Sequence, residues 1–404
     1  MAVCLERGFT GQSLSSGKDA EMQIFISAGE PSGDLHGSNF IAAMRRMRPD
    51  VEFVGFGGER MEAAGCKLLY PLCKLSVMWF LRVLANIHLF LWVLSAADRY
   101  FRHHRPDAVV LIDYPGLHWW LARRARFHGI PVFYFVPPQI WAWGDWRVEK
   151  MRRYVDHVLC TLPFEEAWYR ERGVQATYIG HPYFDAVRKH RLDQEFIQEQ
   201  RSRGGRIVGL LPGSRGQEVA KNFATLRRTA ELLRQETPEV RFLVACFKPE
   251  HKQRIDAALR GCSVPIETHV GKTPEIIHLA EACAAVSGSV SLEMLHYETP
   301  AAITYRVGPL LYALGKMLIR VNSITLVNLI AGKTLYPEYA SPQCHAPQLS
   351  AAIGQWLKQP EARAALVAEL RELKQRVGQP GACERAVAYV LNALATPRTK
   401  RLAA

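Results

Sequence analysis

The middle of the chain reads Leu210-Leu211-Pro212-Gly213-Ser214-Arg215-Gly216-Gln217-Glu218. The apolar run at residues 207–211 predicts a buried strand, and a helical pattern begins near Gln217. A strand that turns through glycine into a helix points unpaired backbone N–H groups at one spot, which attracts anions. Gly213 and Ser214 form this turn, and Arg215 adds a planar cation that matches phosphate oxygens. The stretch therefore predicts either a phosphate site or an ordinary strand–helix turn beside a solvated arginine.

A second turn of the same kind reads Ser287-Gly288-Ser289-Val290-Ser291-Leu292-Glu293. Its small residues, Gly288 and Ser289 among them, allow a diphosphate to approach the start of the following helix. Glu293 falls in the first helical turn, where its carboxylate either accepts the hydroxyls of a ribose or favourably caps the helix dipole. Two such turns in one half of the chain favour a nucleotide-diphosphate site there.

Strands alternate with helices on both sides of these turns. The predicted strands are residues 23–28, 51–56, 108–112, 131–136, 157–160 and 176–179 in the first half, and 207–211, 240–245, 265–269, 284–286 and 301–305 in the second. This alternation predicts βαβ units and mostly parallel sheets. The expected fold class is α/β, with two Rossmann-like doubly wound domains that face each other across a cleft, where such folds bind ligands.

Changes in composition divide the chain into four parts. Residues 1–21 are polar and lack the apolar core of a secretory signal, so we interpret them as a disordered leader or as an artefact of start-codon choice. Residues 22–200 form the expected N-terminal domain, and residues 201–345 form the second domain. Residues 346–404 predict two helices with a break at 378–381, which either dock back or are exchanged between two copies.

The bulk composition favours a cytoplasmic protein with anionic partners. The net charge of the 404 residues is +13, which suits nucleic acid, a phosphorylated substrate or an anionic lipid surface. The nine cysteines are scattered without a C-x-x-C pair, as expected for reduced thiols. The fourteen histidines contain no H-E-x-x-H motif, so no metal site is expected.

The hydrophobic insert at residues 75–97 reads LSVMWFLRVLANIHLFLWVLSAA. Its length permits a transmembrane helix, but Arg82 and Asn86 and its position between strands of one sheet argue against a span. The alternatives are a buried core helix and an interfacial surface that docks on a membrane or binds acyl chains. In the second case four residues are expected to contact lipid: Val77, Met78, Trp79 and Phe80.

Polar residues also follow two strands of the first half. Asp113 ends an apolar strand, where desolvation would make its carboxylate a good general base; otherwise it caps the next helix. Glu30, Ser32 and Asp34 follow the first strand in the same way. The Trp141-Ala142-Trp143 block is either an aromatic wall that stacks on a sugar or a packed loop.

Together these residues resemble a known family, the lipid-A-disaccharide synthases, which are inverting glycosyltransferases of the GT-B fold. The resemblance runs from about Gln23 into the C-terminal helices. It rests on five blocks in order: Gly29-Glu30-Pro31-Ser32-Gly33-Asp34, Trp141-Ala142-Trp143, Gly180-His181-Pro182, residues 211–218 and Asn328-Leu329-Ile330-Ala331-Gly332.

The resemblance implies that 2,3-diacylglucosamine passes from UDP to the 6-hydroxyl of 2,3-diacylglucosamine 1-phosphate. The product is the β-1,6 disaccharide of lipid A in lipopolysaccharide biosynthesis, with release of UDP. The residue match implies that Asp113 is the base and that Glu30 and Ser32 face the acceptor, with Asp34 and His118 assigned to the same side. The same match places four residues on the UDP side: Arg215, Ser289, Glu293 and Asn328.

Without a D-x-D pair to hold a metal, catalysis is expected to need neither metal nor cofactor, with Arg215 and the helix N-termini stabilising the leaving group. The resemblance also implies a peripheral protein of the cytoplasmic face of the inner membrane, no nucleic-acid partner, and a homodimer. The chain departs from the family pattern at three places: Leu117-His118, Ser289-Val290-Ser291 and Val327.

Two alternatives remain at this point. One is another UDP-sugar enzyme of the same fold, such as a UDP-N-acetylglucosamine 2-epimerase or a murein-precursor transferase. The other is a basic protein without catalytic activity that binds nucleic acid or a membrane surface, which the net charge of +13 permits.

Overall fold

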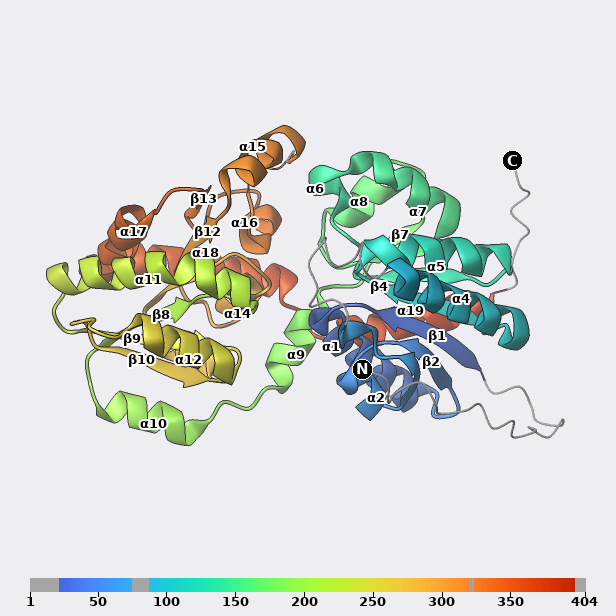
Figure 1. Cartoon of the computed structure of the whole chain (residues 1–404), viewed down its shortest axis with the longest axis horizontal. Helices are drawn as coiled ribbons and strands as arrows, with labels where there is room; N and C mark the ends of the chain where they lie inside the picture. Colours follow the sequence, from blue (N-terminus) through green and yellow to red (C-terminus); the bar gives the residue numbers. More distant parts are fainter. Residues whose placement is uncertain (1–21, 75–86, 320, 322, 397–404) are drawn as a thin grey trace.

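The computed structural model describes residues 22–74, 87–319, 321 and 323–396. Figure 1 shows two α/β domains side by side, joined through α9 and by red C-terminal helices that run from the second domain back to the first. The expected leader at residues 1–21 lies outside the described residues. The same holds for Val77, Met78, Trp79 and Phe80.

The first domain contains a parallel sheet of seven strands in the order β3-β2-β1-β4-β5-β6-β7. Its strands are β1 (Gln23–Ala28), β2 (Glu52–Phe56), β3 (Cys66–Tyr70), β4 (Ala108–Ile112), β5 (Val132–Phe135), β6 (His157–Cys160) and β7 (Ala176–Tyr178). The central strands consist almost wholly of buried apolar residues, because helices cover both faces of the sheet.

The second domain contains a parallel sheet of six strands in the order β10-β9-β8-β11-β12-β13. Its strands are β8 (Arg206–Leu211), β9 (Val240–Cys246), β10 (Ile266–Val270), β11 (Ala282–Val286), β12 (Ala301–Arg306) and β13 (Glu338–Ser341). The two sheets confirm the expected α/β class with two Rossmann-like doubly wound domains. In each sheet the strand order reverses direction beside the first strand, at β1–β4 and at β8–β11, which is where such folds bind ligands.

Helices of the first domain form two layers. One layer, with α4, α5, α7 and α8, shares a core with the face of the sheet that carries Phe25 and Val109. The other layer, with α1 and α2, covers the face that carries Ile24 and Val110. The bounds are α1 (Pro31–Met47), α2 (Glu59–Ala63), η1 (Leu72–Lys74), α4 (Ile87–His104), α5 (Pro115–Phe127), α6 (Ile140–Trp143), η2 (Asp145–Arg147), α7 (Val148–Tyr154) and α8 (Glu165–Arg170).

The helices that follow belong to the connection and to the second domain. Their bounds are α9 (Pro182–Lys189), α10 (Gln194–Ser202), α11 (Gly216–Glu236), α12 (Pro249–Ala258), α13 (Thr273–Leu279), α14 (Val290–His296), α15 (Pro309–Leu318), α16 (Leu326–Ala331), α17 (Ala346–Lys358), α18 (Pro360–Val377) and α19 (Ala382–Ala395). Phe196 on α10 packs in the core of the second domain. The chain therefore enters that domain before the boundary expected at residue 201.

The end of the chain docks back onto the first domain. Helices α17 and α18 pack on the second sheet, whereas α19 packs against α1. The Asp185 carboxylate accepts hydrogen bonds from the backbone N–H groups of Gly381 (2.6 Å) and Cys383 (2.9 Å), which ties the start of α19 to α9. The expectation of two C-terminal helices was wrong, because Pro360 separates α17 from α18 in addition to the expected break before α19.

The hydrophobic insert is partly described, because its second half forms the start of α4. One face of α4 places Val93 and Ala97 in the core, while Ile87, Leu91 and Trp92 on the other face are exposed. Within the described ranges, no helix combines the length and hydropathy needed to cross a membrane.

Candidate functional site

The candidate site lies where the carboxyl ends of the two sheets approach each other. In the first domain, Glu30 follows β1 and Asp113 follows β4, and these two strands are hydrogen-bonded neighbours. In the second domain, Arg215 follows β8 and Glu293 follows β11, which are also neighbours. Arg215 reaches across the gap, where its Nη2 donates to Oε2 of Glu30 over 3.1 Å. The structure therefore brings Asp113, Glu30 and Arg215 to one place.

The Asp113 carboxyl group is poised close to neutral pH. Burial, followed by the nearby charge of Glu30, raises the pKa of Asp113 to about 6, although the Tyr114 N–H group and Arg215 act in the opposite direction. A carboxylate with a pKa in this range is a stronger proton acceptor than an exposed aspartate and is still ionised at pH 7. The site can therefore remove a proton from a hydroxyl placed beside Asp113.

The backbone holds Asp113 in an unusual conformation. Asp113 and Tyr114 both have φ in the left-handed region, at 49° and 48°, which costs roughly 1–2 kcal/mol for each such residue. Compensating contacts converge on the Asp113 backbone: its N–H donates to the Val136 carbonyl (3.1 Å), and its carbonyl accepts from Tyr134 Oη (2.7 Å). Strained backbone held by such contacts occurs at functional sites.

His118 has a different role from the one expected. Its side chain is completely buried, with Nδ1 2.6 Å from the Asp113 carbonyl and Nε2 2.9 Å from Ser27 Oγ. Burial lowers the pKa of His118 to about 3, so the ring is neutral and Nδ1 carries the proton that it donates to the carbonyl. His118 therefore positions Asp113 from behind instead of facing the acceptor. Sequence reasoning missed Ser27 and Tyr134, which complete this support.

Asp34 is also structural. Its Oδ1 accepts hydrogen bonds from the Gly58 N–H (2.8 Å) and the Met61 N–H (3.1 Å), and its Oδ2 accepts from the Arg60 N–H (3.1 Å). The carboxylate is buried and caps the N-terminus of α2, so its assignment to the acceptor side is corrected. Ser32 is exposed in the first turn of α1, beside Glu30.

The turn at residues 212–216 has the predicted geometry, but part of its donor capacity is used internally. Gly213 has φ at 103°, which favours glycine. The backbone N–H groups of Ser214 and Arg215 both donate to Oε2 of Glu218 over 3.2 Å. The Arg215 side chain is 68 % exposed and also lies 3.4 Å from Glu218 Oε1. An incoming diphosphate would therefore interact chiefly with the guanidinium.

The turn at residues 287–291 is open. A Cβ atom added at Gly288 would meet no heavy atom within 4 Å, so a ligand has room to approach this backbone. Ser289 is exposed, whereas Glu293 is buried and accepts a 2.9 Å hydrogen bond from Tyr183 Oη. Burial raises the pKa of Glu293, and the Tyr183 hydrogen bond partly opposes this.

Gly180-His181-Pro182 connects the first sheet to this acid. His181 is the N-cap of α9, where its Nδ1 accepts from the Tyr183 N–H over 3.2 Å. Burial lowers the pKa of His181 to about 3, which keeps the ring neutral and able to accept. The motif thus fixes the position of Tyr183, whose hydroxyl orients Glu293.

Asn328 is buried and uses its whole amide within the protein. Its Nδ2 donates to the Tyr336 carbonyl and to Glu338 Oε1, both over 2.7 Å, and its Oδ1 accepts from the Leu335 and Tyr336 N–H groups, both over 2.9 Å. Direct binding of UDP by this side chain is therefore corrected to a positioning role. Glu338, which accepts from Asn328, also accepts a hydrogen bond from the Ile324 N–H group over 2.7 Å. The Ile324 carbonyl in turn accepts from Ser287 Oγ in the second glycine turn over 3.0 Å.

The two tryptophans of the Trp141-Ala142-Trp143 block differ. Trp141 is buried, donates from Nε1 to Glu165 Oε1 (3.0 Å) and belongs to a cluster that includes Leu329 of α16. Trp143 is exposed, and the Arg147 guanidinium covers one of its faces. The block is therefore a packed contact between the domains that ends in an exposed indole.

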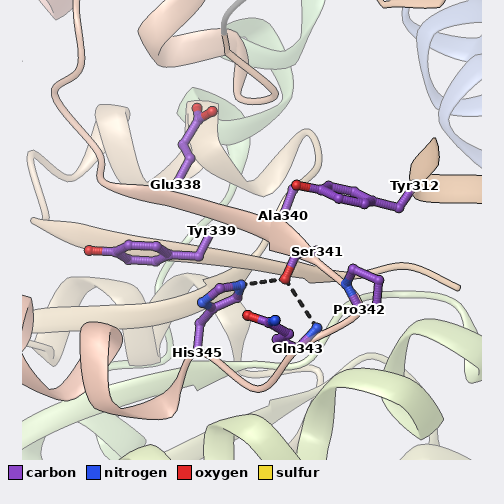
Figure 2. A pocket seen from close by; sticks show the side chains of 8 residues that line it. All are labelled: Tyr312, Glu338, Tyr339, Ala340, Ser341, Pro342, Gln343 and His345. Atoms are coloured by element: carbon purple, nitrogen blue, oxygen red, sulfur yellow. Dashed lines mark hydrogen bonds between the residues drawn. The ribbon is translucent and has the colours of Figure 1, made fainter. Parts of the chain in front are cut away.

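A hollow at the end of β13 is drawn in Figure 2. Ser341 Oγ lies 2.5 Å from His345 Nε2 and accepts from the Gln343 N–H over 3.1 Å. The buried Nδ1 of His345 has no hydrogen-bond partner among the described residues, so no carboxylate there completes a Ser-His-acid triad. Within the described ranges, no group of three or more His, Cys, Asp or Glu residues has a geometry that could hold a metal ion.

The sequence of this chain is similar to one known protein family and to individual members of that family. The model of the lipid-A-disaccharide synthetase family matches residues 24–390. The lipid-A-disaccharide synthase of Geobacter sulfurreducens is 34% identical over 373 residues, which cover 92% of this chain and 97% of that protein. The Syntrophus aciditrophicus enzyme of the same name is 35% identical over 370 residues, covering 91% and 97%.

Solved structures agree with the fold. The UDP-GlcNAc 2-epimerase from Neisseria meningitidis bound to UDP-GlcNAc has a TM-score of 0.63 at 10% identity, covering 92% of this chain and 99% of that one. The glycotransferase of kitacinnamycin has a TM-score of 0.64 at 14% identity, covering 93% and 100%. At these identities the similarity establishes the shared fold alone.

Proposed function

This chain belongs to the lipid-A-disaccharide synthase family and is a glycosyltransferase of lipid A biosynthesis, and from this premise we propose its substrates and the roles of its residues. The donor is UDP-2,3-diacylglucosamine and the acceptor is 2,3-diacylglucosamine 1-phosphate. The products are the β-1,6-linked disaccharide 1-phosphate and UDP. The observation that supports the assignment most is the convergence of Asp113, Glu30 and Arg215 between the two sheets.

In the proposed reaction Asp113 is the general base. The 6-hydroxyl oxygen of the acceptor attacks C1 of the donor sugar while the bond from C1 to the UDP oxygen breaks. Asp113 takes the hydroxyl proton, and both electrons of the broken bond leave with UDP. Its pKa of about 6 supports this role, because the carboxylate is ionised at neutral pH and is partly desolvated.

Arg215 stabilises the diphosphate as it leaves. A guanidinium offers planar paired donors that match phosphate oxygens, and its charge lies where negative charge accumulates. The exposed Ser289 and the open backbone at Gly288 give the diphosphate room beside α14, and Glu293 accepts from the ribose with the oxygen that Tyr183 leaves available. Glu30 and Ser32 contact the acceptor. This scheme needs no metal or cofactor, because Arg215 supplies the positive charge.

We also propose peripheral association with the cytoplasmic face of the inner membrane. Both substrates carry acyl chains, and α4 exposes Ile87, Leu91 and Trp92 at its N-terminal end. Because α4 runs antiparallel to the strand that follows it, this end lies at the carboxyl edge of the sheet, on the side of Asp113. Homodimer formation remains a proposal based on the family.

One assay tests the proposed function directly. Purified protein is incubated with both acylated sugars in detergent, and UDP release and the disaccharide product are measured by chromatography and mass spectrometry. We expect UDP release only when both sugars are present. Hydrolysis of the donor alone, or isomerisation of UDP-N-acetylglucosamine at C2 by the same preparation, would favour the epimerase alternative.

A further inference from the structure

A cluster of tryptophans and basic residues lies beside the candidate site and has no part in the reaction proposed above. It consists of Trp143 at the end of α6, Trp146 and Arg147 in η2, and Lys150 in α7. We call these four residues the tryptophan–arginine cluster. Trp146 is 65 % exposed and Trp143 is 45 % exposed, which is unusual for the largest apolar side chain.

The arrangement of charges in the cluster is specific. The Arg147 Cζ atom lies 3.9 Å from the ring centroid of Trp143 and 5.1 Å from that of Trp146, so the guanidinium stacks on one indole and lies close to the other. Lys150 Nζ lies 5.8 Å from the Trp146 centroid. Stacking engages the face of a guanidinium and leaves its N–H donors in the plane free for an anion.

Positive charge predominates around the cluster. Neither Arg147 nor Lys150 has a carboxylate partner in the part of the chain that the structure describes, whereas the neighbouring Glu149 pairs with Arg152. Residues 145–153 contain four basic and two acidic side chains, which leaves a net charge of +2. The surface is therefore both aromatic and cationic.

The topology places this surface at the carboxyl edge of the first sheet, where Asp113 also lies. Strands β4 and β5 are parallel neighbours, with Ile112 opposite Phe135, so the chain leaves β5 at the edge where Asp113 lies. Helix α6 follows after a short loop, and η2 comes directly before α7. The exposed N-terminal end of α4 lies at the same edge.

We propose that the tryptophan–arginine cluster binds the phosphate headgroups of anionic phospholipids at a bilayer surface. Tryptophan is favoured at the depth of the headgroups, where its ring is apolar and its N–H is polar, and basic residues are attracted to an anionic leaflet. The cluster would hold the edge that carries Asp113 against the membrane, where acylated sugars reside. This inference rests on the proposed function for its orientation, but the surface can be tested separately.

Flotation of the full chain with vesicles tests the proposal. Vesicles of phosphatidylcholine alone are compared with vesicles that also contain phosphatidylglycerol, at low and high salt. We expect stronger binding to the anionic vesicles, which salt weakens. Arg147→Gln should weaken that binding about fivefold, as expected for one basic residue near an anionic surface, and Trp146→Ser should weaken binding to both kinds of vesicle.

Matched controls lie at other positions of the same domain. Arg123→Gln removes the same charge from an exposed position of α5, and Phe127→Ser removes a side chain that is 77 % exposed at the far end of that helix. Both controls should bind vesicles within about twofold of the unchanged protein, since neither lies in the cluster. If Arg147→Gln weakens binding no more than Arg123→Gln, the proposal is wrong.

Two further outcomes are decisive. If Trp146→Ser does not fold, Arg147→Lys serves in its place, because it keeps the positive charge and removes the planar guanidinium. Arg147→Lys should bind anionic vesicles less well than the unchanged protein. Equal binding would contradict the proposal. If cluster variants lose binding to an oligonucleotide but keep vesicle binding, the surface serves nucleic acid and the proposal is wrong. UDP release from detergent-dispersed sugars reports on the reaction alone, so the two proposals fail independently.

Discussion

Arg215 and Glu30 form an ion pair between the two domains, with Nη2 and Oε2 3.1 Å apart. Both residues also act on the pKa of the proposed base, Asp113. The charge of Glu30 raises this pKa, and the charge of Arg215 lowers it. A diphosphate at Arg215 would compete with Glu30 for the guanidinium. Donor binding would therefore release the Glu30 charge next to Asp113 and strengthen the base when the leaving group is in place.

This relationship predicts that Glu30→Gln increases affinity for UDP. Removing the competing carboxylate leaves Arg215 less neutralised, and an exposed ion pair contributes up to about 1 kcal/mol, so we expect the Kd of UDP to fall up to about fivefold. Isothermal titration calorimetry measures this change. Glu231→Gln is the matched control, because Glu231 pairs with Arg228 further along α11. A Kd that rises in Glu30→Gln would contradict the competition.

The pH dependence of the reaction follows from the same pair. We expect kcat/KM to fall as the pH drops through about 6, because protonation of Asp113 removes the base. In Glu30→Gln the midpoint of this acidic limb should move to lower pH, since the neighbouring charge that raises the pKa of Asp113 is gone. An acidic limb with an unchanged midpoint would show that the charge of Glu30 does not raise the pKa of the base.

The raised pKa of Asp113 also predicts a stability effect. A carboxyl group whose pKa is higher in the folded than in the unfolded protein lowers the free energy of unfolding when it is ionised. This destabilisation is complete above the folded pKa and vanishes below the unfolded pKa of 3.8. Asp113→Asn should therefore increase the free energy of unfolding at pH 8 by up to about 3 kcal/mol relative to pH 3.5. Urea unfolding at both pH values measures the difference. Equal effects at both would show that Asp113 is not desolvated.

A substitution at His118 distinguishes a residue that positions Asp113 from one that contacts the acceptor directly. His118→Ala removes the donor to the Asp113 carbonyl and leaves Ser27 without its partner. We expect a lower kcat and an almost unchanged KM for the acceptor, because the ring is buried behind Asp113. A rise in the acceptor KM with unchanged kcat would instead restore the acceptor-side assignment.

Asn328 provides a structural counterpart in the second domain. Asn328→Ala would leave the N–H groups of Leu335 and Tyr336 buried without an acceptor. Each such group costs about 1–3 kcal/mol, so we expect a clear decrease in the free energy of unfolding. Thermal and urea unfolding measure it, with Asn392→Ala on α19 as a comparison. An unchanged stability would show that the loop does not depend on this amide.

The sequence predicted the sheets well because most of their strands are continuous apolar runs that end near glycine, proline or polar residues; β10, which reads IETHV, is an exception. It missed β3 and β13, whose sequences CKLLY and EYAS carry little of that signal. Asp113 and Arg215 were recognisable because each closely follows such a run. In the sequence, the residues near helix starts looked equally suited to bind a ligand, among them Asp34, His118 and Asn328. The folded chain shows that their hydrogen bonds point inward instead, to α2, to Asp113 and to the loop near Tyr336 respectively.

The residues that hold Asp113 in place could not be predicted from the sequence for a different reason. Ser27 on β1 bonds His118, and Tyr134 on β5 donates to the Asp113 carbonyl. Both come close to Asp113 only because β1 and β5 flank β4 in the sheet order β1-β4-β5. Left-handed backbone at two consecutive residues other than glycine has no reliable signature in composition or periodicity. Such contacts depend on tertiary structure, and a pattern within a single segment cannot contain them.

The most direct test is the single-turnover rate of UDP release by Asp113→Asn, with both acylated sugars at saturating concentration in detergent. Removing a general base typically slows a reaction by about 10² to 10⁴-fold, and we expect a decrease of this size with the affinity for UDP nearly unchanged. A rate within about twofold of the unchanged protein, well below what a general base contributes, would contradict the assignment of Asp113 as the base.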